Sequence, residues 1–525
     1  MARRILSFAI DGWVEPAAAF AALFAREPYA FWLDGNLDSM TDDGGRSYLG
    51  VASPGARVAL ASVAEGVVRV RPVGVPGPGT VHRGGVLEFL RCDLAENATE
   101  ETGTGESADA GESAGAGESP DDGESADGGG FRLGWVGWLG YEAGASASGA
   151  PVARSRFPDA ALLFVDRALV FDHREHAVRL LALEAQGAEP GGVDDWVGDI
   201  RSALAGVAAA AAAEGTPAAA PTRAQPAPAR AQPAPAQAAP AAQPEDGAAA
   251  GARHVSWRHG EGRYLELIRE CQAAIARGDA YQLCLTNEAR IDTRPDPLAT
   301  YLALRAASPT HHGGYLRFGD TALLSASPEQ FLSVSPAGLV RTKPIKGTRP
   351  RGATVVRDLE LRAELEASDK ERAENVMIVD LMRNDVGRVA EVGSVEVRHL
   401  LAVESYAQVH QLVSTVEGRL AAGLTGVDAV AACFPAGSMT GAPKLSAMRI
   451  LHGLEAGPRG VYSGCFGYFG LDGAVDLAMV IRSIVLDPKG ASVGAGGGIT
   501  ALSVPEEELA EVRLKAAALL AVLGA

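Results

Sequence analysis

The sequence has few cysteines, no excess of positive charge and no long run of strongly hydrophobic residues. Its five cysteines are scattered without C-x-x-C spacing, which argues against a zinc site or a disulfide framework and favours a reducing compartment. The one long apolar stretch is an alanine tract, which is too weakly hydrophobic to span a membrane. Asp11 interrupts the short apolar run that follows Arg3 and Arg4, so no signal peptide is predicted. We therefore expect a soluble, cytoplasmic protein.

The negative charge of the chain is concentrated in one segment. Lysine and arginine number 47 against 65 aspartates and glutamates, which gives a net charge of −18. Residues 93–130 contain twelve acidic residues and no basic ones, so the remainder of the chain carries only −6. Neither value indicates a nucleic-acid surface or a basic membrane-binding patch. A small anionic substrate is compatible with this composition.

Two segments of low complexity divide the 525 residues. Residues 95–130 repeat Gly-Glu-Ser-Ala units and have too few apolar side chains to form a core, so a disordered insert is predicted. Residues 206–252 are rich in alanine and proline, as in semi-stiff spacers. The sequence therefore predicts an N-terminal region over 1–205, a linker over 206–252 and a C-terminal domain over 253–525.

Hydrophobic patterns on either side of the linker predict a mixture of strands and helices. Residues 131–142 and 161–184 are short apolar runs interrupted by turn residues, which indicates strands. After the linker, apolar residues spaced by three and four predict a helix that ends at Gly278, followed by a strand over 281–286 that places Gln282 and Cys284 on one face. Helices then alternate with strands without a repeated βαβ unit. The expected fold class is α+β.

Three segments carry residues that are suited to chemistry. Lys346 lies between Pro344-Ile345 and Gly347-Thr348, and a lysine held in a pocket can act as a nucleophile, whereas an exposed one is ordinary. Glu374 shares a helical stripe with Ile378, so this carboxylate is expected to face the interior and to need either a cation such as Mg²⁺ or a salt bridge. Lys370, one turn earlier, is the obvious salt-bridge partner.

The last predicted helix opens with Ser503 and Glu506, spaced as a capping box, and carries Glu511 and Lys515 one turn apart. That spacing is typical of a surface ion pair. A glycine run over 495–499 precedes this helix, but its spacing does not match a dinucleotide-binding motif, and residues 434–444 do not match a phosphate-binding loop. These segments alone leave surface and functional interpretations open.

Together the segments resemble the chorismate-utilising enzymes. Nine blocks occur in the expected order: GWVGWLGYE, GDAYQLCLTN, SASPEQF, TKPIKGT, KERAENVMIVDLMRNDVGRV, FPAGSMTGAPK, RGVYSG, VIRSI and AGGGITALSVPEEELAEVRLK. The similarity is dense over about 255–525 and loose over 1–205. It implies the fold of that family, with large β-sheets packed as a sandwich and flanked by helices.

The resemblance also implies the residues of the site. Glu374 and Glu511 match two glutamates that bind Mg²⁺, which in turn holds the substrate's ring carboxylate. Other residues match positions that hold the carboxylates of chorismate. They are Thr348, Tyr462, Arg482, Gly496, Gly497, Gly498 and Lys515.

Two positions indicate the reaction within the family. Members that add water have a lysine where this chain has Gln282, so ammonia is the implied nucleophile. Anthranilate synthases usually have alanine at the position of Lys346, whereas aminodeoxychorismate synthases have lysine there. The resemblance thus implies formation of 4-amino-4-deoxychorismate, with Lys346 attacking ring carbon 2 before ammonia adds at carbon 4. A histidine expected near the departing hydroxyl is replaced by Gln411, with His410 beside it as the alternative acid.

The ammonia is expected to come from a separate glutamine amidotransferase subunit, because none of the five cysteines has the setting of an amidotransferase nucleophile. The product would serve p-aminobenzoate and folate synthesis or a related pathway. Two alternatives stay open. One is the synthase subunit of anthranilate synthase, and the other is a non-catalytic chorismate-binding protein.

Overall fold

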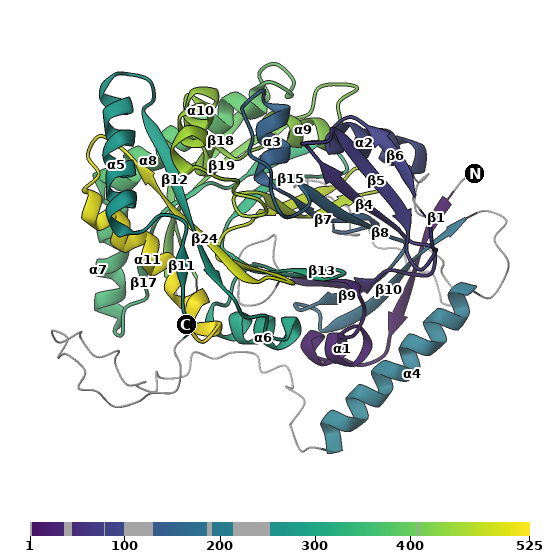
Figure 1. Ribbon diagram of the computed structural model, residues 1–525. Coiled ribbons are helices and arrows are strands. Elements are labelled where there is room, and N and C mark those ends of the chain that lie inside the picture. The colour runs from purple at the N-terminus through teal and green to yellow at the C-terminus, as the bar shows by residue number, and fades with distance from the viewer. Residues whose placement is uncertain are drawn as a thin grey trace, which may run out of the picture.

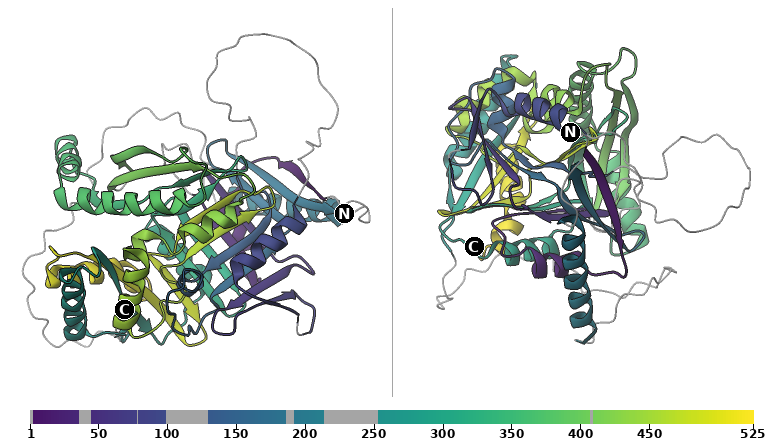
Figure 2. Two further views of the ribbon diagram at one scale, coloured as in Figure 1. Left: turned by 90° about the horizontal axis from the view of Figure 1, so that it is seen from above. Right: turned by 90° about the vertical axis from the view of Figure 1, so that its right-hand side faces the viewer.

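Two large antiparallel sheets pack face to face, and helices cover their outer sides (Figure 1). The computed structural model describes residues 3–35, 45–77, 79–98, 130–185, 192–213, 253–406 and 409–525. Views from above and from the side show the same two layers, with the last helix near the C-terminus at one end (Figure 2). The predicted α+β class and the predicted sandwich are confirmed.

The first sheet contains β1, β10, β9, β3, β2, β13, β14, β23, β24, β12 and β11 in spatial order, with β20 paired to β12. The bounds of these strands are, in the same order, Arg3–Ile10, Ala177–Ala185, Arg167–Asp172, Arg46–Val51, Tyr29–Asp34, His312–Phe318, Thr321–Ser327, Ser483–Asp487, Gly490–Ile499, Gln282–Ile291, Ser256–Trp257 and Gly441–Ala442.

The second sheet contains β17, β19, β16, β15, β22, β21, β7, β8, β4, β5 and β6 in spatial order, with β18 paired to β19. The bounds are, in the same order, Ile345–Pro350, Val409–Arg419, Leu339–Thr342, Gln330–Val334, Val475–Met479, Cys465–Gly470, Gly134–Leu139, Ala160–Val165, Arg57–Ser62, Val67–Pro72, Thr80–Arg83 and Glu396–Ser405.

Both sheets combine strands from the two sides of the alanine- and proline-rich segment. In the first sheet β2 pairs with β13, and in the second β7 pairs with β21. The regions 1–205 and 253–525 are therefore divisions of the sequence that share two sheets and a common interior.

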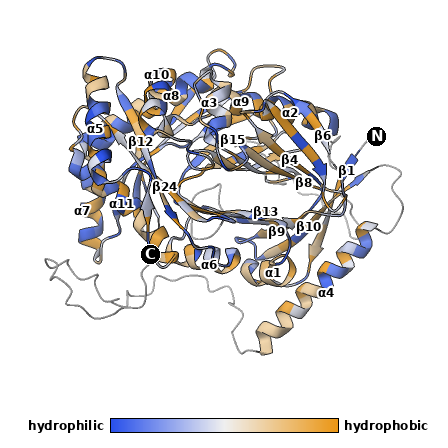
Figure 3. Ribbon diagram, in the orientation of Figure 1, coloured by the Kyte–Doolittle hydropathy of each residue, from blue (hydrophilic) through white to orange (hydrophobic). Residues whose placement is uncertain are grey.

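Two hydrophobic cores lie on opposite faces of the first sheet. Along β2, Phe31 and Leu33 belong to the core between the sheets, whereas Ala30 and Trp32 belong to the core under the helices. This division follows the alternation of side chains along a strand. A strand buried on both faces has no polar side, which explains why such runs are almost wholly apolar in the sequence (Figure 3).

The helices of the described residues are α1 (Pro16–Leu23), α2 (Val86–Asn97), α3 (Tyr141–Ala147), α4 (Gly192–Ala213), α5 (Glu261–Ala276), α6 (Pro297–Ala307), α7 (Val355–Glu366), α8 (Asp369–Gly387), α9 (Gly426–Cys433), α10 (Lys444–Glu455) and α11 (Pro505–Val522), with the short 3₁₀ helix η1 (Gly437–Met439). Three helices were predicted individually, namely α5, α8 and α11, and the others were not. Gly278, just beyond α5, has a φ of +85°, which favours glycine where a helix ends. In the described ranges, no helix is both long and apolar enough to cross a bilayer.

Three local expectations are corrected. The predicted insert over 95–130 begins inside α2, which continues to Asn97, and the predicted linker over 206–252 begins inside α4, which continues to Ala213. Residues 99–129 and 214–252 lie outside the described residues. The predicted capping box is wrong, because Val504 caps α11 and Ser503 donates a hydrogen bond to Glu508 Oε1 at 2.8 Å. Pro505 in the first turn supplies the start signal instead.

Candidate functional site

Lys346 on β17 lies near enough to the predicted metal ligands on α8 and α11 for its charge to act on both. Burial raises the pKa of Glu374 on α8, and the positive charge of Lys346 acts against this shift. For Glu511 on α11, burial acts to raise the pKa, but neighbouring lysines outweigh it and lower the pKa. Those lysines are Lys515, Lys370 and Lys346. The fold thus brings together residues that are far apart in the sequence.

Glycines on β17 and β24 let the backbone pass close to these helices. Gly347 has a φ of +84°, and a Cβ atom there would lie 2.6 Å from Glu371 Cγ, so the residue after Lys346 cannot carry a side chain without a shift. Thr348, exposed on β17, pairs with Gln411 on β19 beyond an irregularity in the register. The strand is therefore distorted at Lys346, as expected where a strand redirects a side chain.

Helix α11 is fixed to the glycine run of β24 by its lysine. Lys515 Nζ donates to the carbonyl oxygen of Gly496 at 2.9 Å and lies 2.7 Å from Glu511 Oε1. The ion pair predicted between Glu511 and Lys515 is thus formed. Both side chains also belong to the charged group around Lys346, because the charge of Lys515 acts on buried Glu329. A contact to the backbone of β24 restricts where the ammonium group can lie.

Three carboxylates gather between α8 and α11. Burial raises the pKa of Glu374, and the charges of Glu508 and Glu511 raise it further. Lys370 lies 3.7 Å from Glu508 rather than pairing with Glu374, so the salt bridge considered from the sequence is not formed. Among the described residues, no set of three or more metal-binding side chains is close enough to form a complete cage. Two carboxylates with remaining positions for water and substrate suit Mg²⁺, so the donor set fits that ion.

The paired strands β12 and β24 form the floor of this region. Cys284 pairs with Gly498, and Thr286 pairs with Gly496. A Cβ atom on Gly498 would lie 2.3 Å from Gln282 Nε2. The Oε1 atom of Gln282 is buried and has no hydrogen-bond partner, which is costly for an amide unless a ligand supplies a donor. Gly497 is less confined, since its Cβ would meet only Glu508 Oε2, at 3.1 Å.

Tyr462 and Arg482 lie beside this floor. Tyr462 occupies a turn before β21, and its Cγ atom lies 2.1 Å from where a Cβ on Gly494 would be. Arg482 has a φ of +51°, an uncommon conformation for a bulky residue. Partial burial lowers the pKa of Arg482, and Tyr462 and Glu511 act against that shift. The structure therefore places Arg482 near both Tyr462 and Glu511.

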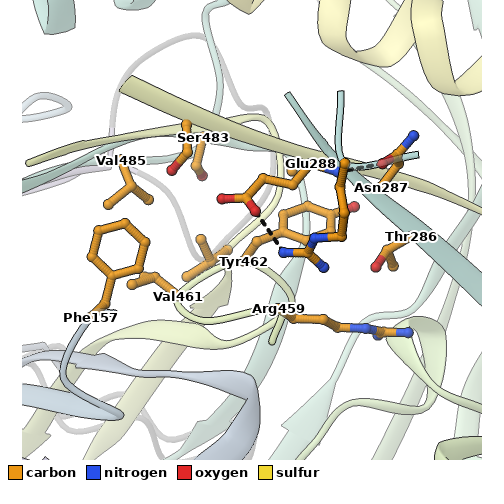
Figure 4. Close-up of a pocket in the computed structure, with 13 residues that line it drawn as sticks. Phe157, Thr286, Asn287, Glu288, Arg459, Val461, Tyr462, Ser483 and Val485 are labelled. Atoms are coloured by element: carbon orange, nitrogen blue, oxygen red, sulfur yellow. Dashed lines mark hydrogen bonds and ion pairs between the residues drawn. The ribbon is translucent and has the colours of Figure 1, made fainter. Parts of the chain in front are cut away.

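A small enclosed cavity adjoins Tyr462 on the side of Arg459 and Phe157 (Figure 4). Its volume of about 20 Å³ corresponds to one water molecule, so a six-membered ring with two carboxylates does not fit. Of the predicted site residues, this cavity is lined by Tyr462 alone. The charged group around Lys346 is the better candidate for the substrate site.

His410 does not join the group around Lys346 through its hydrogen bonds. Its Nδ1 atom lies 2.8 Å from Ser405 Oγ, and its Nε2 atom lies 3.0 Å from Asp358 Oδ1. Asp358 in turn pairs with Arg351 at 2.7 Å. Both ring nitrogens are thus engaged by α7 and β18, and catalysis by His410 stays a prediction that these contacts do not support.

Glu329 is a candidate that the sequence did not single out. It is 8% exposed and follows β14, in the block SASPEQF. Burial raises its pKa, while a hydrogen bond from Ser438 and the charges of Lys346 and Lys515 act against the shift. A buried carboxyl group with a raised pKa beside a lysine is suited to proton transfer. In the sequence, its position within the block SASPEQF was the only indication that this residue has a functional role.

Comparisons with known proteins identify the family of this chain. A family model described as chorismate binding enzyme matches residues 91–521. Aminodeoxychorismate synthases of Streptomyces pristinaespiralis and Streptomyces griseus are 42% and 43% identical over 96% and 99% of this chain. The chain spans less than two thirds of these relatives, covering 63% and 64% of their lengths.

Solved structures show the same fold. Anthranilate synthase component I from Streptococcus pneumoniae TIGR4 superposes with a TM-score of 0.65 at 25% identity, covering 98% of this chain and 99% of that one. The menaquinone-specific isochorismate synthase from Escherichia coli has a TM-score of 0.62 at 15% identity, covering 99% and 95%. At that identity, the second likeness concerns the fold alone.

Proposed function

Because the chain belongs to the chorismate binding enzyme family, we propose that it converts chorismate and ammonia into 4-amino-4-deoxychorismate. The observation that carries the proposal is the position of Lys346 beside Glu374 and Glu511. A primary amine next to carboxylates that suit Mg²⁺ provides both a nucleophile and an anchor for a dianionic ring. The identity of 42–43% to two aminodeoxychorismate synthases supports the same reaction.

The carboxylates of chorismate would be held by cationic and backbone donors. Arg482 can donate two parallel hydrogen bonds to a carboxylate. Tyr462 adds a hydroxyl donor, and Lys515 is already fixed to the carbonyl of Gly496. Glu374 and Glu511 would hold Mg²⁺, which supplies positive charge to a substrate carboxylate. The absence of a side chain at Gly498 lets the Gln282 amide lie close to the floor.

In the first step, the neutral amine of Lys346 forms a bond to ring carbon 2, the two conjugated ring double bonds each shift by one position, and the hydroxyl at carbon 4 departs. Glu329 in its protonated form gives its proton to that hydroxyl, which leaves as water. The Lys346 nitrogen keeps both of its protons as a secondary ammonium, which makes it a leaving group for the second step. A positioned acid contributes because an alkoxide is a poor leaving group.

In the second step, ammonia forms a bond to carbon 4, the two ring double bonds shift back, and the secondary ammonium at carbon 2 leaves as the neutral amine of Lys346. The proton lost by ammonia reprotonates Glu329 and so restores the starting state. Gln282 is suited to hold ammonia, because its partnerless Oε1 atom can accept an N–H. A glutamine is not basic enough to activate water, which agrees with ammonia as the nucleophile.

Product identification tests this function. The purified chain is incubated with chorismate, Mg²⁺ and ammonium, and the products are separated by chromatography beside authentic standards. The proposal requires 4-amino-4-deoxychorismate. Anthranilate would support the second candidate, an anthranilate synthase subunit, which the near-complete overlap with the solved Streptococcus pneumoniae protein favours. Recovery of unreacted chorismate alone would favour a binding protein.

We further infer that a glutamine amidotransferase supplies the ammonia. The relatives contain a further third of sequence that this chain does not match, which is enough for an additional catalytic unit. All five cysteines are free and four are buried, so none is an accessible amidotransferase nucleophile except exposed Cys92. Free cysteines also support a cytoplasmic location.

A further inference from the structure

Glu142, in the first turn of α3, binds the backbone of the turn that precedes β21. One carboxylate oxygen accepts from the Arg459 N–H at 2.8 Å, and the other accepts from the Gly460 N–H at 2.9 Å. Tyr141, the preceding residue, donates its N–H to the Gly460 carbonyl at 2.9 Å. Glu142 is only 3% exposed, so its carboxylate depends on these protein donors.

The side chain of Arg459 connects the same turn to the floor of the site. Its guanidinium donates to the carbonyl oxygens of Cys284 at 2.8 Å and Met439 at 2.6 Å, and it lies 2.7 Å from Glu455 Oε1. Glu455 also accepts from Thr286 N and Oγ1, each at 2.9 Å. A fully buried network therefore joins α3, the turn, α10 and β12.

Tyr462 lies two residues beyond Gly460, on the same turn (Figure 4). The backbone reverses sharply there, with φ values of +64° at both Gly460 and Ser463, a conformation that is held only when its surroundings fix it. We propose that Glu142 is a positioning residue for the reaction: its ionised carboxylate clamps residues 459–460 and so fixes Tyr462 against the substrate. This inference rests on the substrate role proposed for Tyr462.

The clamp requires both carboxylate oxygens as acceptors, so protonation of Glu142 weakens it. Burial and the charge of Asp159 together raise the pKa of Glu142 to about 7, against hydrogen bonds from the backbone N–H groups of Arg459, Gly460 and Glu142 itself. The other ionisable groups of this network are Tyr141, Glu455 and Arg459, whose guanidinium lies 4.4 Å from the Tyr141 ring. The clamp should therefore loosen as the pH falls through about 7.

The test combines backbone exchange with kinetics on the full chain. In Glu142→Gln, amide hydrogen exchange of residues 459–463 should become faster, and the KM for chorismate should rise about tenfold or more, because one backbone donor loses its acceptor. In the wild type, KM at fixed free ammonia should rise as the pH is lowered from 8 to 6. In Glu142→Gln, KM should be high and independent of pH over this range.

Asp159→Asn is the matched control. Asp159 is also a buried carboxylate that accepts from a backbone N–H, that of Val63 at 2.7 Å, but it does not bind the turn. This variant should keep the wild-type KM at pH 8 and move the midpoint of the pH dependence to lower pH, because it removes a charge that raises the pKa of Glu142. If Asp159→Asn or Glu142→Gln does not fold, the pH dependence of the wild-type KM for chorismate between pH 8 and pH 6 serves as the test.

Unchanged exchange at residues 459–463 in Glu142→Gln would overturn the clamp, and so would a wild-type KM that is equal at pH 6 and pH 8. Tyr462→Phe separates the two proposals. If its chorismate KM equals that of the wild type while Glu142→Gln exchanges faster, the clamp is supported and the substrate role of Tyr462 fails. If both variants raise KM, both proposals hold.

Discussion

Glu374 on α8 and Glu511 on α11 lie close enough that the charge of Glu511 adds to burial in raising the pKa of Glu374. The two carboxylates repel each other, and the charges of nearby lysines offset part of this repulsion. The fold thus holds carboxylates and ammonium groups together in one cluster. Such a cluster of perturbed ionisable groups is typical of a functional site.

Replacing either carboxylate should abolish turnover while the fold survives. Glu374→Gln and Glu511→Gln each remove a hard anionic ligand, so we expect a loss on the order of a hundredfold or more in chorismate turnover at saturating ammonium. Initial rates over a Mg²⁺ titration measure the effect. Glu507→Gln, an exposed position in the first turn of α11, is the control. Near-normal rates in both variants would contradict the proposed Mg²⁺ site and would leave the two glutamates with a structural role only.

Glu329 should account for loss of activity at high pH. Its raised pKa keeps the carboxyl group protonated closer to neutrality, and the proposed proton donor is lost as the pH rises above that pKa. Glu329→Gln should lower kcat by about a hundredfold or more and remove this alkaline decline. Rates must be compared at constant free ammonia, because ammonia itself increases with pH. An alkaline decline that persists unchanged in Glu329→Gln would exclude the assignment.

Shortening the two low-complexity segments should have little effect on stability. The structure sets the limits at 99–129 and 214–252, because α2 continues to Asn97 and α4 to Ala213. Neither composition supplies enough apolar side chains for a core, so each shortened chain should melt within about 2 °C of the wild type, provided a spacer still joins α4 to β11. A cooperative loss of folding in calorimetry would contradict this expectation.

The isolated chain should use ammonium but not glutamine. Addition of a cognate glutamine amidotransferase subunit should confer glutamine-dependent turnover without changing the product. Parallel assays with each nitrogen source, before and after addition of the subunit, measure this. Glutamine use by the pure chain alone would reveal an amidotransferase activity within it.

Local patterns in the sequence predicted helices well where one apolar face of the helix packs against a hydrophobic core. The spacing of apolar residues before Gly278 gave α5, and the stripe through Glu374 and Ile378 gave α8. The boundaries of the low-complexity segments were less accurate, because alanine-rich residues at the end of α4 continue a helix as readily as they begin a spacer.

Hydrogen-bond and ion-pair partners that come from distant elements could not be predicted from the local spacing of residues. Lys370 is one turn from Glu374 in the sequence, but it pairs with Glu508 from α11. The ring of His410 is oriented by Asp358 from α7, and buried Glu329 meets Ser438, Lys346 and Lys515 from distant parts of the chain. The resemblance supplied the candidate residues, and the packing of the sheets decided which of them lie together.

The claim at the centre of this account is that the amine of Lys346 attacks chorismate. Chorismate and Mg²⁺ are mixed with the chain without ammonium, the reaction is quenched in acid, and the peptide that carries Lys346 is analysed by mass spectrometry, with exposed Lys489 as the internal control. The account predicts an adduct of chorismate minus one water on Lys346 alone, which disappears when ammonium is added. It also predicts an inactive Lys346→Arg variant, because arginine keeps the charge but does not deprotonate. Absence of the adduct together with near-wild-type formation of 4-amino-4-deoxychorismate by Lys346→Arg would contradict it.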